Sequence, residues 1–349
     1  MQRGAVQPSA SERVRCAFCG YELSDARVRD SAGVAYCSER CRDAAEAGEE
    51  PFAGEFDFKR FSPGVPALES LLPNGIPSNS FVLLTGESGI RHRGLQTELV
   101  WRTLRRDEPA IVITFVDPPI AIVEHFLTFD WNVLPYLESG DLQIIDCYTM
   151  RLRKKHRTPD HQAPWNEFLG GFLDGSVSVI QEPGNLESVE NSLHDHLEAA
   201  DMTGTGIVVI DSLNEVEIQG REAETEQFIK EVRGDVCSRK FVPIFASVTG
   251  TADEQPTKEY DYLFDGIVQM QRNESRIEGV RLKQLSIQKM DGALYRPHWV
   301  TYEITGPSGF RIFTPETDLL SVYGSPTLSG RAEPATHPRR GPPHHQQPR

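Results

Sequence analysis

Four cysteines near the N-terminus have the spacing of a metal-binding site. Cys16 and Cys19 form a C-x2-C pair, and after an interval of seventeen residues Cys37 and Cys41 form a C-x3-C pair. A C-x2-C turn places two sulfurs on one cation, and four thiolates suit a closed, tetrahedral site for structural Zn²⁺. The two other cysteines stand alone in apolar segments, so we expect a zinc site rather than a disulfide framework.

The residues around these cysteines must bring the two pairs together. The pattern predicts a hairpin of two strands, Ala26–Arg29 and Val34–Tyr36, and Ser38 is a suitable N-cap for a helix after it. A cysteine knuckle, a hairpin and a helix together make a treble clef over residues 13–45, and Tyr36–Cys41 resembles TRASH/FCS-type treble clefs. Because the protein supplies all four ligands, catalysis at the metal is not expected. Protein docking, metal sensing, nucleic-acid binding and an assembly role stay open.

A second candidate site follows the first long apolar run of the main domain. Gly86–Arg93 stands where a Walker A loop, G-x-x-x-x-G-K-[ST], joins a strand to a helix. Of its defining positions, only Gly86 is kept. Arg91 replaces the second glycine, His92 replaces the lysine that reaches the phosphates, and Arg93 replaces the hydroxyl that holds Mg²⁺. These replacements predict that ATP hydrolysis is lost.

Two interpretations of the altered loop stay open. Arg91, His92 and Arg93 lie at a predicted helix N-terminus, where backbone N–H groups and the helix dipole favour negative charge. On the first interpretation the loop therefore holds phosphate or a nucleotide without turnover. On the second, these side chains point to solvent or pair with Glu87 and Glu98.

The sequence around the loop resembles the KaiC-like branch of the RecA superfamily. Leu71–Ser80 before the strand and Gly86–Gly89 after it are similar to the beginning of such domains. Ile207–Leu213 is similar to their Walker B strand, in which an aspartate, here Asp211, lies by the water shell of Mg²⁺. Lys289–Gly292 resembles the K-M-R-G segment near the end of the family's domains.

The resemblance covers residues 56–315 and implies a RecA/KaiC-like P-loop fold, an α/β architecture with a mostly parallel central sheet. The chain departs from the family at its catalytic positions. Val116-Asp117 stands in place of paired glutamates that activate water, and Asp291 replaces an arginine that reaches a neighbour's nucleotide, although Lys289 remains. The resemblance thus implies the fold without efficient turnover. The nucleotide-binding candidates that it implies are Gly86, Ser88, Gly89, Arg91, His92, Arg93, Asp211 and Ser212.

The order of apolar segments predicts the sheet that would position the loop. Five short β-branched runs are typical of buried parallel strands, at Phe81–Thr85, Ile111–Phe115, Leu142–Asp146, Ile207–Asp211 and Val242–Val248. Helical spacing of apolar residues separates them, at Leu95–Leu104, Leu186–Leu197 and Phe228–Val236. The later pattern predicts an antiparallel or mixed extension of the sheet, at Ile267–Gln271, Leu282–Gln288, Trp299–Ile304 and Phe310–Phe313.

The composition favours a soluble protein with an acidic surface. Acidic residues outnumber basic ones by 51 to 36, the formal net charge is −15, and only eight of the basic residues are lysines. Such a surface repels nucleic acid and is typical of proteins from a salt-loaded cytoplasm, which predicts a halophilic archaeal source. The apolar runs are too short to span a bilayer and the first residues lack the pattern of a signal peptide, so we expect a cytoplasmic protein.

Three parts of the chain are predicted: the zinc module at residues 13–45, the RecA/KaiC-like domain at 56–323, and a disordered Pro/His/Arg-rich tail at 324–349. Residues 151–157 form a basic run within this acidic chain. The run would contact nucleic acid or an acidic partner, or else lie in solvent or on the protein's own acidic surface.

Three functions fit these observations. The leading hypothesis is a regulatory or signal-transduction pseudo-ATPase, a platform for an unidentified protein partner or a homo-oligomer. Its expected cofactor is Zn²⁺, whereas ATP with Mg²⁺ is disfavoured and no membrane partner is expected. The second hypothesis is a nucleic-acid-associated regulator that uses the zinc module and the basic run. The third is a nucleotide-binding ATPase with an unorthodox phosphate loop.

Overall fold

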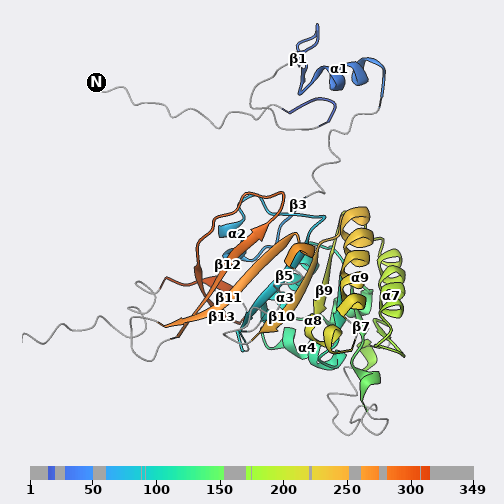
Figure 1. Ribbon diagram of the computed structural model, residues 1–349, viewed down its shortest axis with the longest axis vertical. Coiled ribbons are helices and arrows are strands. Elements are labelled where there is room, and N and C mark those ends of the chain that lie inside the picture. Colours follow the sequence, from blue (N-terminus) through green and yellow to red (C-terminus); the bar gives the residue numbers. More distant parts are fainter. Residues whose placement is uncertain are drawn as a thin grey trace, which may run out of the picture. The chain divides into compact units, whose positions relative to one another are not determined.

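A single ten-stranded sheet organises the main domain (Figure 1). In the computed structural model its strand order is β14-β13-β12-β11-β5-β10-β9-β6-β7-β8. The structure describes residues 15–19, 28–49, 60–87, 89–90, 92–152, 170–173, 175–219, 222–250, 261–274, 281–306 and 308–314. The strands of the large sheet are β5 (Phe81–Glu87), β6 (Ala110–Thr114), β7 (Leu142–Asp146), β8 (Val177–Val179), β9 (Ile207–Asp211), β10 (Ile244–Gly250), β11 (Gly266–Glu274), β12 (Arg281–Met290), β13 (Val300–Thr305) and β14 (Gly309–Ile312).

The parallel half of the sheet confirms the five predicted strands. β5 pairs with β10, β10 with β9, β9 with β6 and β6 with β7, all in parallel. β7 and β9 begin and end where the sequence predicts, because their runs of apolar residues are buried on both faces. Sequence reasoning missed β8, a three-residue edge strand that is only partly buried.

The other half of the sheet is antiparallel, as the sequence predicts. β11 lies parallel to β5 on one side and antiparallel to β12 on the other. β13 and β14 continue the antiparallel order to the edge of the sheet. The sheet as a whole is therefore mixed, and its phosphate-loop strand β5 lies between β10 and β11, close to the junction of the parallel and antiparallel parts.

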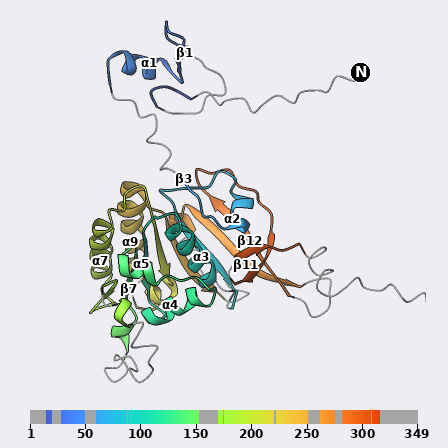
Figure 2. The ribbon, with the colours of Figure 1, turned by 180° about the vertical axis from the view of Figure 1, so that it is seen from behind.

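Helices cover both faces of the sheet and enclose two separate cores (Figures 1 and 2). Alternate residues of β5 divide between them: Val82 and Leu84 face one core, whereas Phe81 and Leu83 face the other. The first face carries α2 (Pro66–Leu71), α3 (His92–Leu104), α4 (Pro119–Leu127) and α5 (Leu134–Ser139). The opposite face carries α7 (Leu186–Ala199), α8 (Leu213–Gln219), α9 (Glu222–Val232) and the π-helical segment η4 (Arg233–Arg239).

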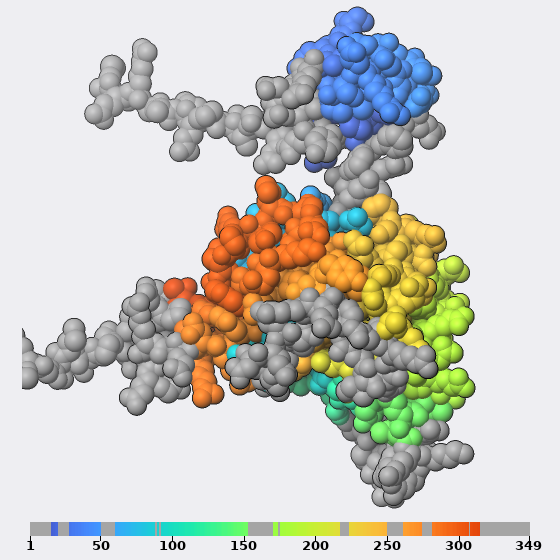
Figure 3. Space-filling model, in the orientation of Figure 1, coloured from blue at the N-terminus to red at the C-terminus, as the bar shows by residue number. Residues whose placement is uncertain are grey.

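These helices confirm the three predicted from apolar spacing. α3, α7 and the α9–η4 pair contain the predicted stretches, and the buried leucines of α7 face the sheet at intervals of four residues. The space-filling view shows α9 in yellow and the antiparallel strands in orange on one face of the molecule (Figure 3). Among the helices that the structure describes, none is long and apolar enough to cross a membrane.

The described residues of the N-terminal module contain a small core of their own, Cys16, Phe18 and Tyr36. The module contains a short antiparallel hairpin, β1 (Val28–Arg29) with β2 (Ala35–Tyr36), followed by α1 (Glu39–Glu46). Ser38 caps α1 as predicted, since its hydroxyl accepts a hydrogen bond from the Cys41 N–H at 3.3 Å. The second strand begins at Ala35, one residue later than predicted, and residues 26 and 27 of the first predicted strand lie outside the described residues. The predicted tail, 324–349, and most of the basic run lie outside the described residues.

Candidate functional site

The carboxyl ends of the central parallel strands meet at one edge of the sheet and surround a cleft. β5 leads into the altered phosphate loop and α3, β6 leads to Asp117, and β9 ends at Asp211. A cavity of about 530 Å³ opens there. It is lined by Gly89, His92, Arg93, Gly94, Thr97, His125, Thr128, Phe129, Asp211, Ser247 and Thr249. The fold thus brings the loop and the predicted Walker B aspartate to one site.

The guanidinium of Arg93 bridges two carboxylates in this cleft. Its Nε donates to Asp211 Oδ2 at 2.7 Å, and its Nη1 lies 2.6 Å from Asp117 Oδ2. Asp211 is 5% exposed, and its other oxygen accepts a hydrogen bond from the Ser247 hydroxyl at 3.2 Å. Charge-assisted contacts of this length are short and strong. Arg93 therefore joins the first turn of α3 to the ends of β6 and β9.

A Mg²⁺ ion does not fit between these carboxylates as they are arranged here. The Arg93 guanidinium already lies between Asp117 and Asp211, in contact with both. Mg²⁺ requires oxygen ligands at about 2.1 Å in near-octahedral geometry, and it would have to displace this side chain. The loop position that supplies a hydroxyl ligand in a Walker A motif supplies this cation instead.

His92, at the position of the loop lysine, is buried rather than directed at a ligand. Its side chain is 6% exposed, and a Cβ built on Gly86 would lie 2.8 Å from its Nε2. Burial lowers the pKa of His92 to about 4, although a hydrogen bond with the Thr85 backbone opposes that shift. Its Nε2 has no hydrogen-bond partner in the described part of the chain. At neutral pH His92 is thus uncharged, unlike the lysine it replaces.

A second arginine lies over the loop. Gly89 has a φ of +80°, and a Cβ at this position would lie 2.5 Å from Nη2 of Arg272 on β11. A side chain at residue 89 would therefore be strained and would also meet the guanidinium. Arg272 is exposed, and no acidic side chain pairs with it among the residues described. Among the described residues, two cations therefore lie close to the loop: Arg272 against Gly89 and Arg93 in the first turn of α3.

His125 of α4 is a residue of the cleft that sequence reasoning missed. Its Nδ1 is buried and lacks a partner among the described residues. Burial lowers the pKa of His125, and the Arg93 charge lowers it further, whereas Asp117 and Asp211 raise it. Nothing in the sequence sets this histidine apart, because it belongs to no motif and comes from a helix that follows a different strand. A cavity of about 20 Å³, room for a water molecule, lies beside it and behind Arg93.

The structure brings six of the eight predicted nucleotide-binding residues to this edge of the sheet, and the other two, Ser88 and Arg91, lie outside the described residues. The predicted alternative pairing with Glu98 is wrong for Arg93. Glu98 is fully buried and instead accepts hydrogen bonds from Arg102, at 2.9 Å and 3.1 Å, and from the Phe310 N–H at 2.6 Å. Its carboxylate ties α3 to β14, so it is not available to the loop.

Ser212 follows Asp211 and belongs to a small polar network at the strand ends. Its hydroxyl donates to the Asn214 side-chain oxygen at 3.1 Å. The Asn214 side chain also accepts a hydrogen bond from the Thr249 N–H at 2.8 Å and donates one to the Thr249 carbonyl at 3.1 Å. These contacts fix the end of β9 against the end of β10.

Lys289, the retained residue of the K-M-R-G-like segment, is engaged within its own chain. Its ammonium donates to the Phe264 carbonyl at 2.7 Å and lies 3.1 Å from Asp291 Oδ2. Asp291 replaces the arginine of the family pattern, so the two residues at these positions pair with each other. Lys289 is therefore not an isolated cation within the described part of the chain.

Arg151, the first residue of the basic run, folds back onto the domain. Its Nη1 donates to the Phe115 carbonyl at 2.9 Å and to Glu215 at 3.1 Å, and its guanidinium lies over the Phe115 ring. This residue therefore contacts the protein's own acidic surface. Residues 153–157 of the run lie outside the described residues.

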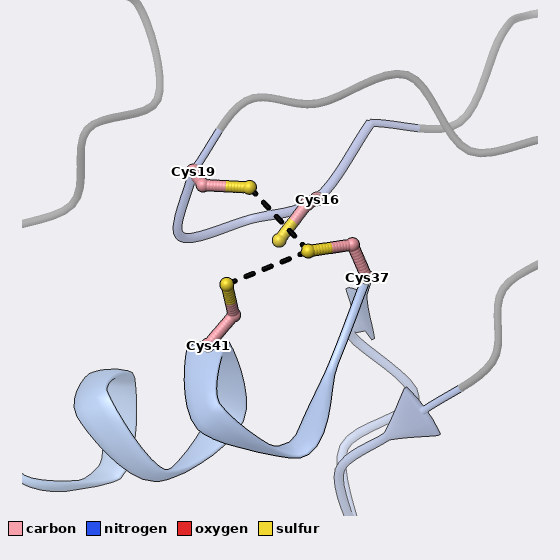
Figure 4. Close-up of side chains that lie close together, drawn as sticks. All are labelled: Cys16, Cys19, Cys37 and Cys41. Atoms are coloured by element: carbon pink, nitrogen blue, oxygen red, sulfur yellow. Dashed lines mark hydrogen bonds between the residues drawn. The ribbon is translucent and has the colours of Figure 1, made fainter.

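The four N-terminal cysteines form a compact cluster of sulfurs (Figure 4). Their Sγ atoms all lie within 4.8 Å of one another, and the Cys19–Cys37 and Cys37–Cys41 sulfurs are 3.5 Å apart. Four thiolates around tetrahedral Zn²⁺ have sulfurs roughly 3.8 Å apart. Burial raises the pKa of Cys16, but hydrogen bonds from the Cys19, Cys37 and Phe18 backbone outweigh it and lower the pKa to about 6. The cluster therefore fits zinc.

Comparison with known proteins identifies relatives of the main domain. The family model "ATPase: KaiC" matches residues 61–317. A UPF0273 protein of Thermotoga maritima is 25% identical over 251 residues, which cover 71% of this chain and 93% of that protein. A UPF0273 protein of Pyrococcus horikoshii is 22% identical over 250 residues, which cover 71% of this chain and 91% of that protein. The crystal structure of a KaiC-like protein from Pyrococcus horikoshii superposes with a TM-score of 0.56, 16% identity, and coverage of 73% of this chain and 99% of that one, which supports the shared fold.

Proposed function

This chain belongs to the KaiC family of ATPases, and we propose that within this family it is a regulatory or signal-transduction pseudo-ATPase. On this proposal it serves as a protein-binding or assembly platform and does not hydrolyse ATP efficiently. The observation that carries the proposal is the Arg93 guanidinium, which lies between Asp117 and Asp211 where a metal-dependent site needs a divalent cation.

The electrostatics of the cleft support the loss of turnover. Phosphoryl transfer depends on cations that stabilise charge as it develops on the transferred group. Here His92 is buried and uncharged, and the charge of Arg93 is already balanced by two carboxylates. Asp117 is the carboxylate nearest in sequence to the family's water-activating position, and its oxygen is held in an ion pair. Loss of even one stabilising group of this kind costs two to three orders of magnitude in rate, roughly 10²–10³.

The zinc module supports the platform role. Its four thiolates leave no open coordination position, so the metal would fold the module rather than react. A small folded module in the same chain as a domain with impaired turnover is suited to docking a protein partner. The acidic, lysine-poor composition fits a salt-rich archaeal cytoplasm, which we include in the proposal.

The nucleic-acid alternative has weaker support. Arg151 is the one charged residue of the basic run that the structure describes, and it is committed to Glu215 and the Phe115 carbonyl. The net charge of −15 opposes association with phosphate backbones.

A phosphate-release assay with ATP and Mg²⁺ tests the proposal. We expect the wild type to release phosphate no faster than the Asp211→Ala variant, because neither has a metal-dependent centre. Asp195→Ala, at an exposed position of α7, is the matched control for removal of a carboxylate. Hydrolysis that is present in the wild type and in Asp195→Ala but absent from Asp211→Ala would show an active ATPase and refute the proposal.

A further inference from the structure

The cleft holds a cation of its own at the place where its relatives' chemistry calls for a metal. Asp117 and Asp211 are both bonded by one guanidinium, at 2.6 Å and 2.7 Å. We infer that Arg93 is a covalently tethered replacement for the divalent cation, and that the cleft therefore binds a diphosphate group as the metal-free anion. The inference rests on the proposed function because it concerns the same cleft, but it makes a claim about binding and none about turnover.

Competition between Arg93 and a free metal ion is unequal. The guanidinium is attached to α3, so it never leaves the site by diffusion, whereas a metal ion must be recruited from solution. An entering ion would also have to break the charge-assisted hydrogen bond to Asp211 and the ion pair with Asp117, and it would be repelled by the displaced positive charge. A ligand that arrives with Mg²⁺ bound meets the same repulsion. The site therefore favours the ligand without its metal.

Arg93 still has donors to offer. A guanidinium has five N–H groups, and the contacts from Nε to Asp211 and from Nη1 to Asp117 use two of them. Its Nη2 has no partner within the described part of the chain, and the side chain is 35% exposed in the wall of the cleft. Arg93 can thus contact the two carboxylates through Nε and Nη1 and still donate from Nη2 to an anionic oxygen, as a metal ion would do by bridging.

Two further features point to an anion at the same place. The thirteen-residue helix α3 begins at His92, and the N–H groups of its first turn have no partners within the helix. The buried ring of His92, 6% exposed and unpartnered at Nε2 among the described residues, lies in the wall of the cleft at this helix end. The Arg272 guanidinium lies against Gly89 of the loop.

The charges and the size of the cleft favour a diphosphate. Arg93 and Arg272 together balance Asp117 and Asp211, and the N-terminus of α3 adds a partial positive charge. These positive groups reduce the repulsion that Asp117 and Asp211 would exert on an anion. A cavity of about 530 Å³ lies within the range of small-molecule sites and accommodates a nucleoside diphosphate.

Isothermal titration calorimetry with ADP, in EDTA and in excess Mg²⁺, tests the inference. We expect the wild type to bind ADP at least about fivefold more tightly in EDTA than in Mg²⁺. Mg²⁺ bound to the phosphates would compete with Arg93 for their oxygens, and its charge would repel the guanidinium. Inorganic pyrophosphate is titrated in parallel. Binding of pyrophosphate with the same metal preference assigns recognition to the diphosphate group, whereas binding of ADP alone assigns part of it to the nucleoside.

Variants separate the role of Arg93 from general effects of charge. Arg93→Thr restores the loop hydroxyl and removes the tethered cation, so the preference should reverse and Mg²⁺ should tighten ADP binding. Arg105→Ala removes an exposed arginine just beyond the other end of α3 and should leave the wild-type preference unchanged. Arg272→Ala should weaken binding under both conditions. If Arg93→Thr fails to fold, the affinity of the wild type for ADP in EDTA and in Mg²⁺ still tests the inference.

Three results would overturn the inference. The first is ADP binding by the wild type that requires Mg²⁺ or is tighter with it. The second is no binding of ADP or pyrophosphate under either condition. The third is an unchanged preference in a folded Arg93→Thr variant. The proposed function fails on a different result, Asp211-dependent phosphate release, so the two ideas are distinguished by separate assays.

Discussion

Replacing Arg93 by threonine should destabilise the domain in a way that Mg²⁺ partly repairs. The substitution removes contacts at 2.6 Å and 2.7 Å and leaves Asp117 and Asp211 facing each other without a cation. Breaking a fully buried ion pair costs roughly 3–5 kcal/mol. Because the Arg93 side chain is 35% exposed, solvent screens the pair, and we expect a loss of about 2 kcal/mol. For a domain of this size that corresponds to a fall in Tm of about 4–8 °C.

The assay is thermal unfolding followed by circular dichroism, in EDTA and in excess Mg²⁺. Mg²⁺ should raise the Tm of Arg93→Thr, since two carboxylates and a hydroxyl then remain as oxygen ligands, and should leave the wild type unchanged. Arg105→Ala reports the effect of losing an exposed arginine near the same helix. A Tm of Arg93→Thr equal to that of the wild type in EDTA would refute the stabilising role of the ion pair. A Tm that Mg²⁺ raises equally in both proteins would refute the replacement of metal by Arg93.

Three other properties follow from the structure. Purified protein should contain one Zn²⁺ per chain by metal analysis, and Cys37→Ser with Cys41→Ser should remove it and leave the main domain folded; stoichiometric zinc in that double variant would contradict the assignment. Burial, and then Glu231 and Asp235, raise the pKa of Glu190 to about 8, so the folded state keeps a proton that the unfolded state releases above about pH 4.5. The stability of the fold therefore falls as the pH rises from about 4.5 to about 8. In urea unfolding, Glu190→Gln should add about 1 kcal/mol of stability at pH 8 and nothing at pH 4. DNA binding, measured by fluorescence anisotropy, should be weak and should vanish with salt; tight, sequence-selective binding at high salt would favour the nucleic-acid alternative.

Much of the fold could be predicted because buried strands and helices have recognisable local patterns of apolar residues. β9 is a run of mostly β-branched residues buried on both faces, and β7 is similar except for the partly buried Gln143, so the bounds of both strands can be predicted without knowing their partners. Ser38 was predicted as a helix cap because its hydroxyl acts within three residues. β8, in contrast, is a short edge strand with an exposed valine, Val179, and its pairing with β7 is what defines it.

The cleft could be located from the sequence, but its chemistry could not. Asp211 was predicted at the end of a parallel strand, and the fold places it there. The ion pairs of Arg93 join residues 24 and 118 positions apart, and they depend on where one long side chain points after the sheet has formed. A motif comparison registers Arg93 as the loss of a hydroxyl. It does not show that the Arg93 guanidinium lies between the two carboxylates. Nor does it show that the Arg272 guanidinium lies against Gly89.

Anomalous diffraction from crystals soaked in Mn²⁺ and ADP tests the central claim most directly, because it locates the cation of the cleft. In the wild type we predict density for the Arg93 guanidinium between Asp117 and Asp211 and no manganese peak in contact with either carboxylate. Crystals of Arg93→Thr treated identically should show a manganese peak there, which controls for access of the ion. A manganese ion that binds Asp211 in the wild type, with Arg93 displaced from the site, would contradict the account.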